Sequence, residues 1–225
     1  MKNQPVVAID GPSGVGKSTV AKGVAKIMNY QFIDTGALYR TVALVASQKN
    51  IDWNDASNIS KEAVKQTFTF DPDGNLSLNG TPVGETIRNN KIAQGASAVA
   101  KHKEVRDALL TIQRNLGKHG AVVLEGRDIG TVVFPGAEIK FYLTASIKER
   151  AKRRFLQLKK QNSNVTIDEV ETAQIERDKQ DTEREIAPLK KADDALEVNC
   201  ENMSADQVIA FMCDHINKHL KNTRQ

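Results

Sequence analysis

The sequence lacks the features that mark membrane-inserted, secreted or disulfide-rich proteins. No apolar run in its 225 residues approaches the roughly 18 residues that a membrane-spanning helix needs. Residues 1–4 lead into only five apolar-type residues before Asp10, so we expect no signal peptide. The two cysteines, Cys200 and Cys213, show no metal-ligand spacing, and we expect both to be reduced, buried thiols. These absences predict a cytoplasmic protein without a membrane partner.

Patterns typical of several other protein classes are also missing. The four histidines show neither catalytic-triad nor metal-binding spacing, and the chain has no internal repeat or low-complexity linker. Aromatic residues make up only 5% of the chain. The length and the 40% hydrophobic content suit one α/β unit with a small insertion.

Positive charge is the main compositional bias. The net charge is +4, and seven Lys or Arg stand against one acid between Lys148 and Lys160. Such a run is either a solvated helix face or a site for an anion. Only Phe155 supplies an aromatic ring in this stretch, so a base-stacking surface for RNA is not indicated.

Short apolar runs alternate with helical patterns along most of the chain, which predicts a doubly wound parallel sheet. The predicted strands are residues 5–9, 31–34, 121–124, 139–143 and 195–198. The predicted helices are 17–28, 37–47, 90–117 with a break near His102, 146–162, 167–185 and 204–221, with Ser204 as a cap. We expect polar loops at 125–130 and 161–164.

The pattern of polar and apolar residues changes near the middle of the chain. Residues 67–70 and 76–78 alternate polar and apolar side chains, and Asp71-Pro-Asp-Gly74 and Asn79-Gly80 supply turns. This pattern predicts a small antiparallel meander within an insertion of about residues 65–90. It is too small to hold a core of its own.

One motif carries specific chemistry. Gly11-Pro-Ser-Gly-Val-Gly16-Lys17-Ser18 fits G-x-x-x-x-G-K-[ST], between a predicted strand and a predicted helix. Glycines allow several backbone N–H groups to point at one phosphate at the positive end of a helix. Lys17 would reach the β- and γ-phosphates, and Ser18 would bind Mg²⁺. The motif predicts nucleoside triphosphate binding and leaves the acceptor open.

The remainder of the chain favours a small-molecule kinase over other P-loop proteins. A GTPase would carry N-K-x-D, which is absent, and the strand ending at Glu125 lacks the paired acids of many ATPases. Arg40, Arg127 and Asp128 follow predicted strands, at the edge where α/β sheets bind ligands.

Four motifs together resemble those of the bacterial cytidylate kinases, within the P-loop nucleoside monophosphate kinases. They are residues 9–18, Asp34-Thr-Gly-Ala-Leu-Tyr-Arg40, Gly126-Arg-Asp-Ile-Gly-Thr-Val-Val-Phe-Pro135, and Glu176-Arg-Asp-x-x-Asp181 with Arg184 and Ala187-Pro-Leu189. Their order and spacing match along essentially the whole chain. The resemblance implies a CORE (1–64, 91–150 and 190–225), a nucleotide-binding insertion (about 65–90) and a LID (about 151–189).

The resemblance also implies roles for individual residues. Arg40 and Arg127 would bind the acceptor phosphate, and Thr35, Ser97, Arg106 and Asp128 would surround the cytosine and sugar. Arg177 and Asp181 would contact the sugar, and Arg184 the base or phosphate. Arg150, Arg153 and Arg154 would join Lys17 near the transferring phosphoryl group. Because positions 150 and 154 share a helix face, we expect one of these three arginines to face solvent. The ATP-binding residues would be Gly11, Pro12, Ser13, Gly14, Val15, Gly16, Lys17, Ser18 and Thr19.

The sequence therefore predicts an enzyme that uses ATP and Mg²⁺ to phosphorylate CMP or dCMP, with small nucleotides as its partners. A kinase for UMP or another small phosphate acceptor is the alternative within the class. A basic RNA-binding protein is the alternative from another class, although we expect no stable nucleic-acid partner. We expect a monomer, and packing roles for Tyr39 and Trp53.

Overall fold

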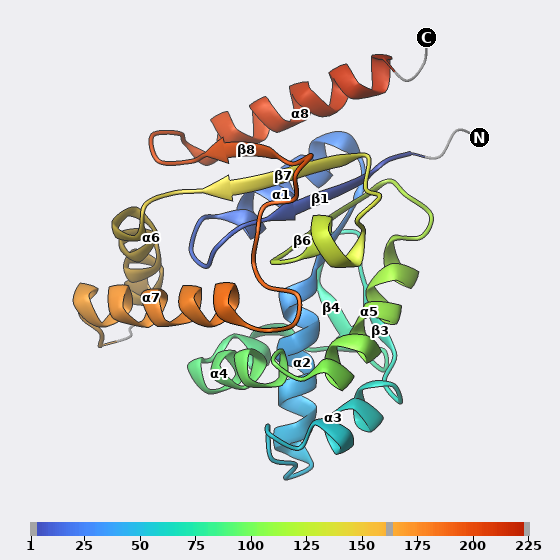
Figure 1. Ribbon diagram of the computed structural model, residues 1–225, viewed down its shortest axis with the longest axis vertical. Coiled ribbons are helices and arrows are strands. Elements are labelled where there is room, and N and C mark those ends of the chain that lie inside the picture. Colours follow the sequence, from blue (N-terminus) through green and yellow to red (C-terminus); the bar gives the residue numbers. More distant parts are fainter. Residues whose placement is uncertain (1–3, 161–163, 223–225) are drawn as a thin grey trace.

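A parallel sheet with helices on both faces forms the centre of the computed structural model, which describes residues 4–160 and 164–222 (Figure 1). Within these residues, the five strands lie in the order β2-β6-β1-β7-β8. They are β1 (Val6–Asp10), β2 (Gln31–Asp34), β6 (Val122–Gly126), β7 (Ile139–Thr144) and β8 (Leu196–Asn199). This arrangement confirms the predicted doubly wound α/β fold.

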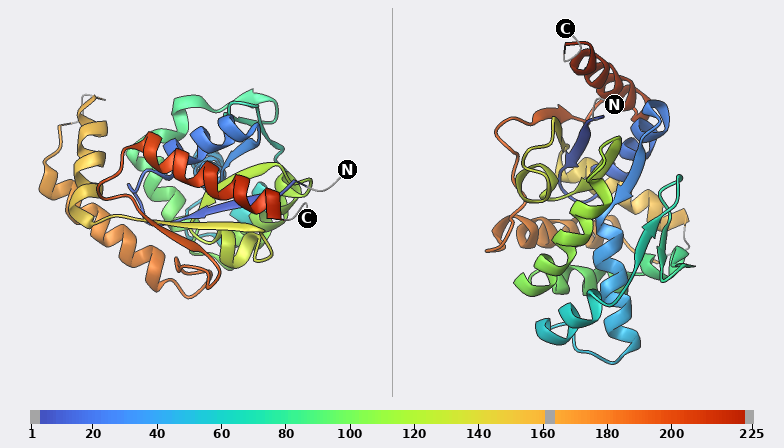
Figure 2. Two further views of the ribbon diagram at one scale, coloured as in Figure 1. Left: turned by 90° about the horizontal axis from the view of Figure 1, so that it is seen from above. Right: turned by 90° about the vertical axis from the view of Figure 1, so that its right-hand side faces the viewer.

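Successive residues of the central strands enter two different cores, because side chains alternate across a strand. Val7 and Ile9 belong to the core that includes α1 (Lys17–Met28) and α8 (Ala205–Asn222). Ala8 belongs to the other core, with α2 (Thr35–Gln48). Figure 2 shows α8 lying across one face of the sheet. Burial on both faces explains why the strands are continuously apolar.

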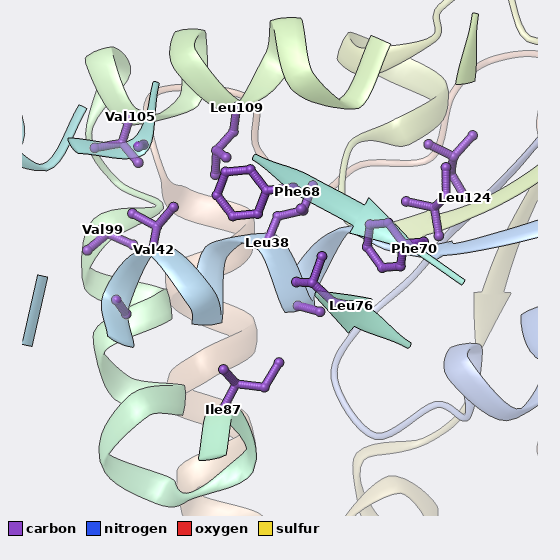
Figure 3. Close-up of a cluster of buried hydrophobic side chains, with 14 of the residues drawn as sticks. Leu38, Val42, Phe68, Phe70, Leu76, Ile87, Val99, Val105, Leu109 and Leu124 are labelled. Carbon is purple, nitrogen blue, oxygen red and sulfur yellow. The ribbon is translucent and has the colours of Figure 1, made fainter. Parts of the chain in front are cut away.

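The insertion forms a second, antiparallel sheet in the order β3-β4-β5. Its strands are β3 (Phe68–Phe70), β4 (Leu76–Leu78) and β5 (Thr81–Pro82). Phe68, Phe70 and Leu76 lie in the same buried cluster as Leu38 and Val42 of α2 (Figure 3). The insertion therefore packs into the core on that side of the parallel sheet.

The other helical segments are α3 (Ala56–Ala63), the 3₁₀ turn η1 (Gly84–Arg88), α4 (Asn90–Val99), α5 (Lys103–Gly117), the π-helix η2 (Ile129–Val133), α6 (Ile147–Lys160) and α7 (Ile167–Glu183). The break predicted near His102 is confirmed, and the Ser204 hydroxyl caps α8 by accepting from Gln207 N at 3.2 Å. The sequence did not indicate α3, a short helix that buries only Ile59 and Ala63.

The loop predicted at residues 125–130 is shorter in the structure, where only Arg127 and Asp128 lie outside regular elements. Strand β6 continues through Glu125 and Gly126, because their backbones pair with Ile9 and Asp10 of β1. The π-helix then begins at Ile129. The charge of Glu125 suggests the end of the strand, but the hydrogen-bond ladder with β1 continues past it.

Helices α6 and α7 project to one side of the sheet and pack on each other (Figure 1). Ala151, Leu158 and Val170 form a small core of their own between them. Most of the predicted 161–164 loop between these helices lies outside the described residues. In the described part of the chain, no helix is both long and apolar enough to cross a membrane, and both cysteines are buried.

Candidate active site

The turn between β1 and α1 has the geometry that its glycines predict. Gly14 and Gly16 have φ angles of 75° and 102°, in the left-handed region that favours glycine. A side chain at Gly11 would place its Cβ 2.4 Å from the carbonyl oxygen of Leu143. The buried Lys17 begins α1, and its Nζ donates to the carbonyl oxygens of Gly11 and Pro12, both at 2.8 Å. The backbone turn and its lysine therefore form one compact unit.

Acidic residues lie at the carboxyl ends of three neighbouring strands beside this turn. They are Asp10 on β1, Asp34 on β2 and Glu125 on β6. Glu125 is only 4% exposed, and its Oε1 has no hydrogen-bond partner among the described residues. Burial raises the pKa of Glu125, helped by the nearby Asp34, while the Ser18 side chain acts in the opposite direction. Glu125 is not among the residues that the sequence predicts for the site, although an acid near the end of a buried parallel strand is a usable signal.

Asp10 was also missed by sequence reasoning. Its carboxylate accepts hydrogen bonds from the backbone N–H groups of Ile129 at 2.8 Å and Gly130 at 2.7 Å. Burial raises the pKa of Asp10 to about 6, against the lowering effect of these two bonds. Asp10 thus joins the strand before the phosphate-binding turn to the π-helix.

A cleft of about 1110 Å³ extends from this turn toward α4, α5, α6 and α7. Within the described residues, its lining includes every predicted site residue except Gly11, Pro12 and Arg150. Residues far apart in the sequence therefore meet around one space.

Four arginines gather on the side of the cleft that faces α7. Arg40 pairs with Asp34 at 2.7 Å, and Arg127 pairs with Asp181 at 2.8 Å. Burial lowers the pKa of Arg177 to about 10, with further lowering by Arg127, Arg40 and Arg154. The Nε atoms of Arg40 and Arg177 are buried without hydrogen-bond partners in the described part of the chain. The four-arginine cluster (Arg40, Arg127, Arg154 and Arg177) is suited to an anion with several oxygens.

A second group of charges centres on Asp128. Arg106 donates to Asp128 Oδ2 from α5, and Arg184 Nη2 lies 3.5 Å from Oδ1. The Arg106 guanidinium also lies over the ring of Tyr39, 5.5 Å from its centroid. The structure therefore brings together Arg106, Asp128 and Arg184 and adds Tyr39 to the same wall.

Two predicted hydroxyl groups already have local partners. Thr35 Oγ1 donates to the carbonyl oxygen of Glu125 at 2.7 Å, and Ser97 Oγ donates to that of Ala93 at 3.3 Å. Both residues line the cleft. Each hydroxyl oxygen can still accept a hydrogen bond from a ligand.

The three α6 arginines do not share one environment: Arg153 and Arg154 line the cleft, whereas Arg150 does not. Arg150 is buried away from the cleft, donating to the carbonyl oxygen of Ser13 at 3.0 Å and pairing with Asp178 at 2.6 Å. It connects the phosphate-binding turn to α7, which is a positioning role. Arg153 donates to the carbonyl oxygens of Val15 and Cys200, and Arg154 to Gln157. Contrary to expectation, none of the three is fully exposed to solvent in the described structure.

Comparison with known proteins identifies close sequence relatives. The family model described as cytidylate kinase matches residues 7–218. The cytidylate kinase of Bacillus pumilus (strain SAFR-032) is 43% identical over 217 residues, covering 95% of this chain and 96% of its own. That of Bacillus subtilis (strain 168) is 43% identical over 212 residues, covering 92% and 94%.

A likeness among solved structures supports the fold alone. A gluconokinase from Sinorhizobium meliloti 1021 matches with a TM-score of 0.51 at 14% identity, covering 100% of this chain and 98% of its own. The family match spans the phosphate-binding turn, the Asp128 group and both helices beside the cleft. The chain belongs to the cytidylate kinase family.

Proposed function

We propose that this protein transfers the γ-phosphoryl group of ATP to CMP or dCMP, giving CDP or dCDP and ADP. The observation that carries the proposal is that one cleft is lined by both the phosphate-binding turn and the four-arginine cluster. Two polyanions can therefore meet inside it. The curated relatives named cytidylate kinase support the same activity.

Positioning and charge stabilisation account for catalysis at this site. Residues 11–19 hold the ATP phosphates through backbone N–H groups, and Lys17 contacts the β- and γ-phosphates. Arg154, with Arg153 beside it, neutralises charge on the transferring phosphoryl group. No covalent intermediate with the protein is needed, because the acceptor phosphate attacks directly.

Mg²⁺ fits the residues beside Lys17. Ser18, the second residue of α1, offers a hydroxyl, and the buried Glu125 offers an oxygen without a partner in the described residues. Hydroxyl and carboxylate oxygens, directly or through water, are the ligands that Mg²⁺ prefers. Bound there, the ion would neutralise charge on the triphosphate.

Glu125→Gln should raise the Mg²⁺ concentration for half-maximal activity by about tenfold or more, as loss of a supporting metal contact commonly does. The amide keeps the shape and removes the negative charge. The measurement is initial rate against Mg²⁺ at saturating nucleotides. Glu104→Gln, at an exposed position on α5, is the matched control. Equal Mg²⁺ dependence in all three proteins would contradict the role of Glu125.

The acceptor occupies the opposite part of the cleft in this proposal. Arg40 and Arg127 bind its phosphate, and Arg177 and Asp181 contact its sugar. Thr35, Ser97, Arg106, Asp128 and Arg184 surround the base and sugar. All of these residues line the cleft, which supports their assignment to the acceptor.

Helices α6 and α7 act as a lid over the nucleotides, in a LID of about residues 151–189. They have their own small core and carry many of the cleft's arginines. Bound anions would hold these arginines together. Backbone hydrogen exchange in α6 and α7 should therefore slow when an ATP analogue and CMP are both present. Helix α8 is the internal control, and exchange that slows equally in α8 or nowhere would contradict closure.

The direct test of the function is ADP release with each nucleoside monophosphate offered in turn. CMP and dCMP should be the preferred acceptors. Preference for UMP would move the assignment to the alternative within the kinase class. The absence of ADP release with every monophosphate tested would overturn the assignment.

A further inference from the structure

The π-helix η2 has an unusual cap. The first N–H groups of any helix have no partner within it, and the side chain just before the helix usually accepts from them. Asp128 occupies that position, but its carboxylate makes no capping bond in the described structure. Asp10, 119 residues earlier in the chain, accepts from Ile129 N and Gly130 N instead.

Because Asp10 accepts these two capping bonds, the Asp128 carboxylate is available to contact groups in the cleft. One of its oxygens accepts from Arg106, and the other lies 3.5 Å from Arg184 Nη2. The negative charges of Asp10 and Asp128 also repel each other, which favours Asp128 turning away from the helix end.

We propose that Asp10 is a positioning residue for the acceptor nucleotide: by capping η2 in place of Asp128, it keeps the Asp128 carboxylate directed toward Arg106, Arg184 and the bound base. Without the Asp10 carboxylate, Asp128 is the nearest group able to cap η2. Capping would pull it away from the two arginines. This inference rests on the proposed function, because it assigns the acceptor's base to the Asp128 group.

Loss of the Asp10 carboxylate should weaken binding of the acceptor nucleotide without weakening binding of ATP. Asp10→Asn removes one acceptor oxygen and one negative charge beside Lys17. Loss of charge alone would strengthen the binding of any anion, and loss of folded structure would weaken the binding of both nucleotides. Only a misplaced Asp128 weakens CMP binding selectively.

The experiment measures the Kd of CMP alone, and of a non-hydrolysable ATP analogue alone, by calorimetry. Asp10→Asn should weaken CMP binding by about tenfold, the usual consequence of one unsatisfied buried polar contact. Binding of the ATP analogue should be unchanged or tighter. Asp55→Asn is the matched control, because Asp55 caps α3 at an exposed site outside the cleft lining and its loss should leave both values unchanged.

Two further variants test whether Asp10 acts through Asp128 and keep the test valid if Asp10→Asn misfolds. In an Asp128→Asn background, the effect of Asp10→Asn on CMP binding should disappear, because it acts through Asp128. Asp10→Glu keeps every charge but adds a methylene, so the carboxylate can no longer hold its position 2.8 Å from Ile129 N and 2.7 Å from Gly130 N. It should weaken CMP binding in the same direction, even if Asp10→Asn does not fold.

Each outcome has a distinct meaning. Wild-type protein that does not bind CMP would overturn the proposed function and this inference with it. Wild-type protein that binds CMP, with Asp10→Asn and Asp10→Glu binding it equally well, would overturn only the role of Asp10. If the binding of CMP and of the ATP analogue weakened equally, Asp10 would support the folded structure in general and would not position Asp128.

Discussion

Lys17→Ala should lower kcat by at least about a hundredfold, because a preorganised charge contact commonly contributes on the order of 3 kcal/mol to the barrier. The Lys17 Nζ lies within the turn that holds the phosphates, bonded to the carbonyl oxygens of Gly11 and Pro12. Burial, and after it the nearby Arg127, lowers the pKa of Lys17. A bound triphosphate brings negative charge and favours the protonated form that catalysis needs.

The matched control is Lys26→Ala, which removes an exposed lysine from the last turn of the same helix. Steady-state rates at saturating ATP and CMP give kcat, and circular dichroism shows whether each variant is folded. Lys26→Ala should retain the wild-type rate. A folded Lys17→Ala protein with near-normal kcat would contradict the catalytic assignment.

CMP should be strongly preferred over UMP, by a factor corresponding to roughly 2–5 kcal/mol of unpaired polar contacts. Cytosine has a 4-amino donor with N3 and O2 acceptors, whereas uracil has a 4-oxo acceptor and an N3–H donor. A carboxylate can accept from the amine, and a guanidinium can donate to N3 and O2. The structure provides this combination in Asp128 and Arg106, which are paired in the wall of the cleft. Uracil would leave both groups mismatched.

Arg106→Met and Asp128→Ala should each lower kcat/KM for CMP and narrow the ratio of CMP to UMP. The two residues form a buried ion pair, so each change also removes a charge partner from the protein interior. Thermal denaturation must therefore accompany the kinetics. Lys103→Met and Asp107→Ala break an exposed ion pair on the same helix α5 and should leave the ratio unchanged. Equal wild-type use of CMP and UMP would refute selectivity, and an unchanged ratio in both variants would place recognition elsewhere.

Local sequence patterns were sufficient for the elements whose structure depends on nearby residues. The G-x-x-x-x-G-K-S turn predicted α1 beginning at Lys17, because its glycines and lysine act within one short segment. Apolar runs predicted the five parallel strands, and Asp-Pro-Asp-Gly with Asn-Gly predicted the turns of the antiparallel meander. Resemblance to a family, rather than periodicity, singled out the acceptor arginines.

The sequence by itself determined the fold class, the phosphate-binding turn and the set of residues from which the cleft is built. Only the tertiary structure decided which of them line the cleft. Arg150 has the same side chain as Arg154, yet Ser13 and Asp178 hold it outside the cleft, and both partners come from other elements. Glu125 and Asp10 gain their environments from neighbouring strands and from η2. Burial and hydrogen bonding between distant segments appear only when the chain is folded, so no local pattern can encode them.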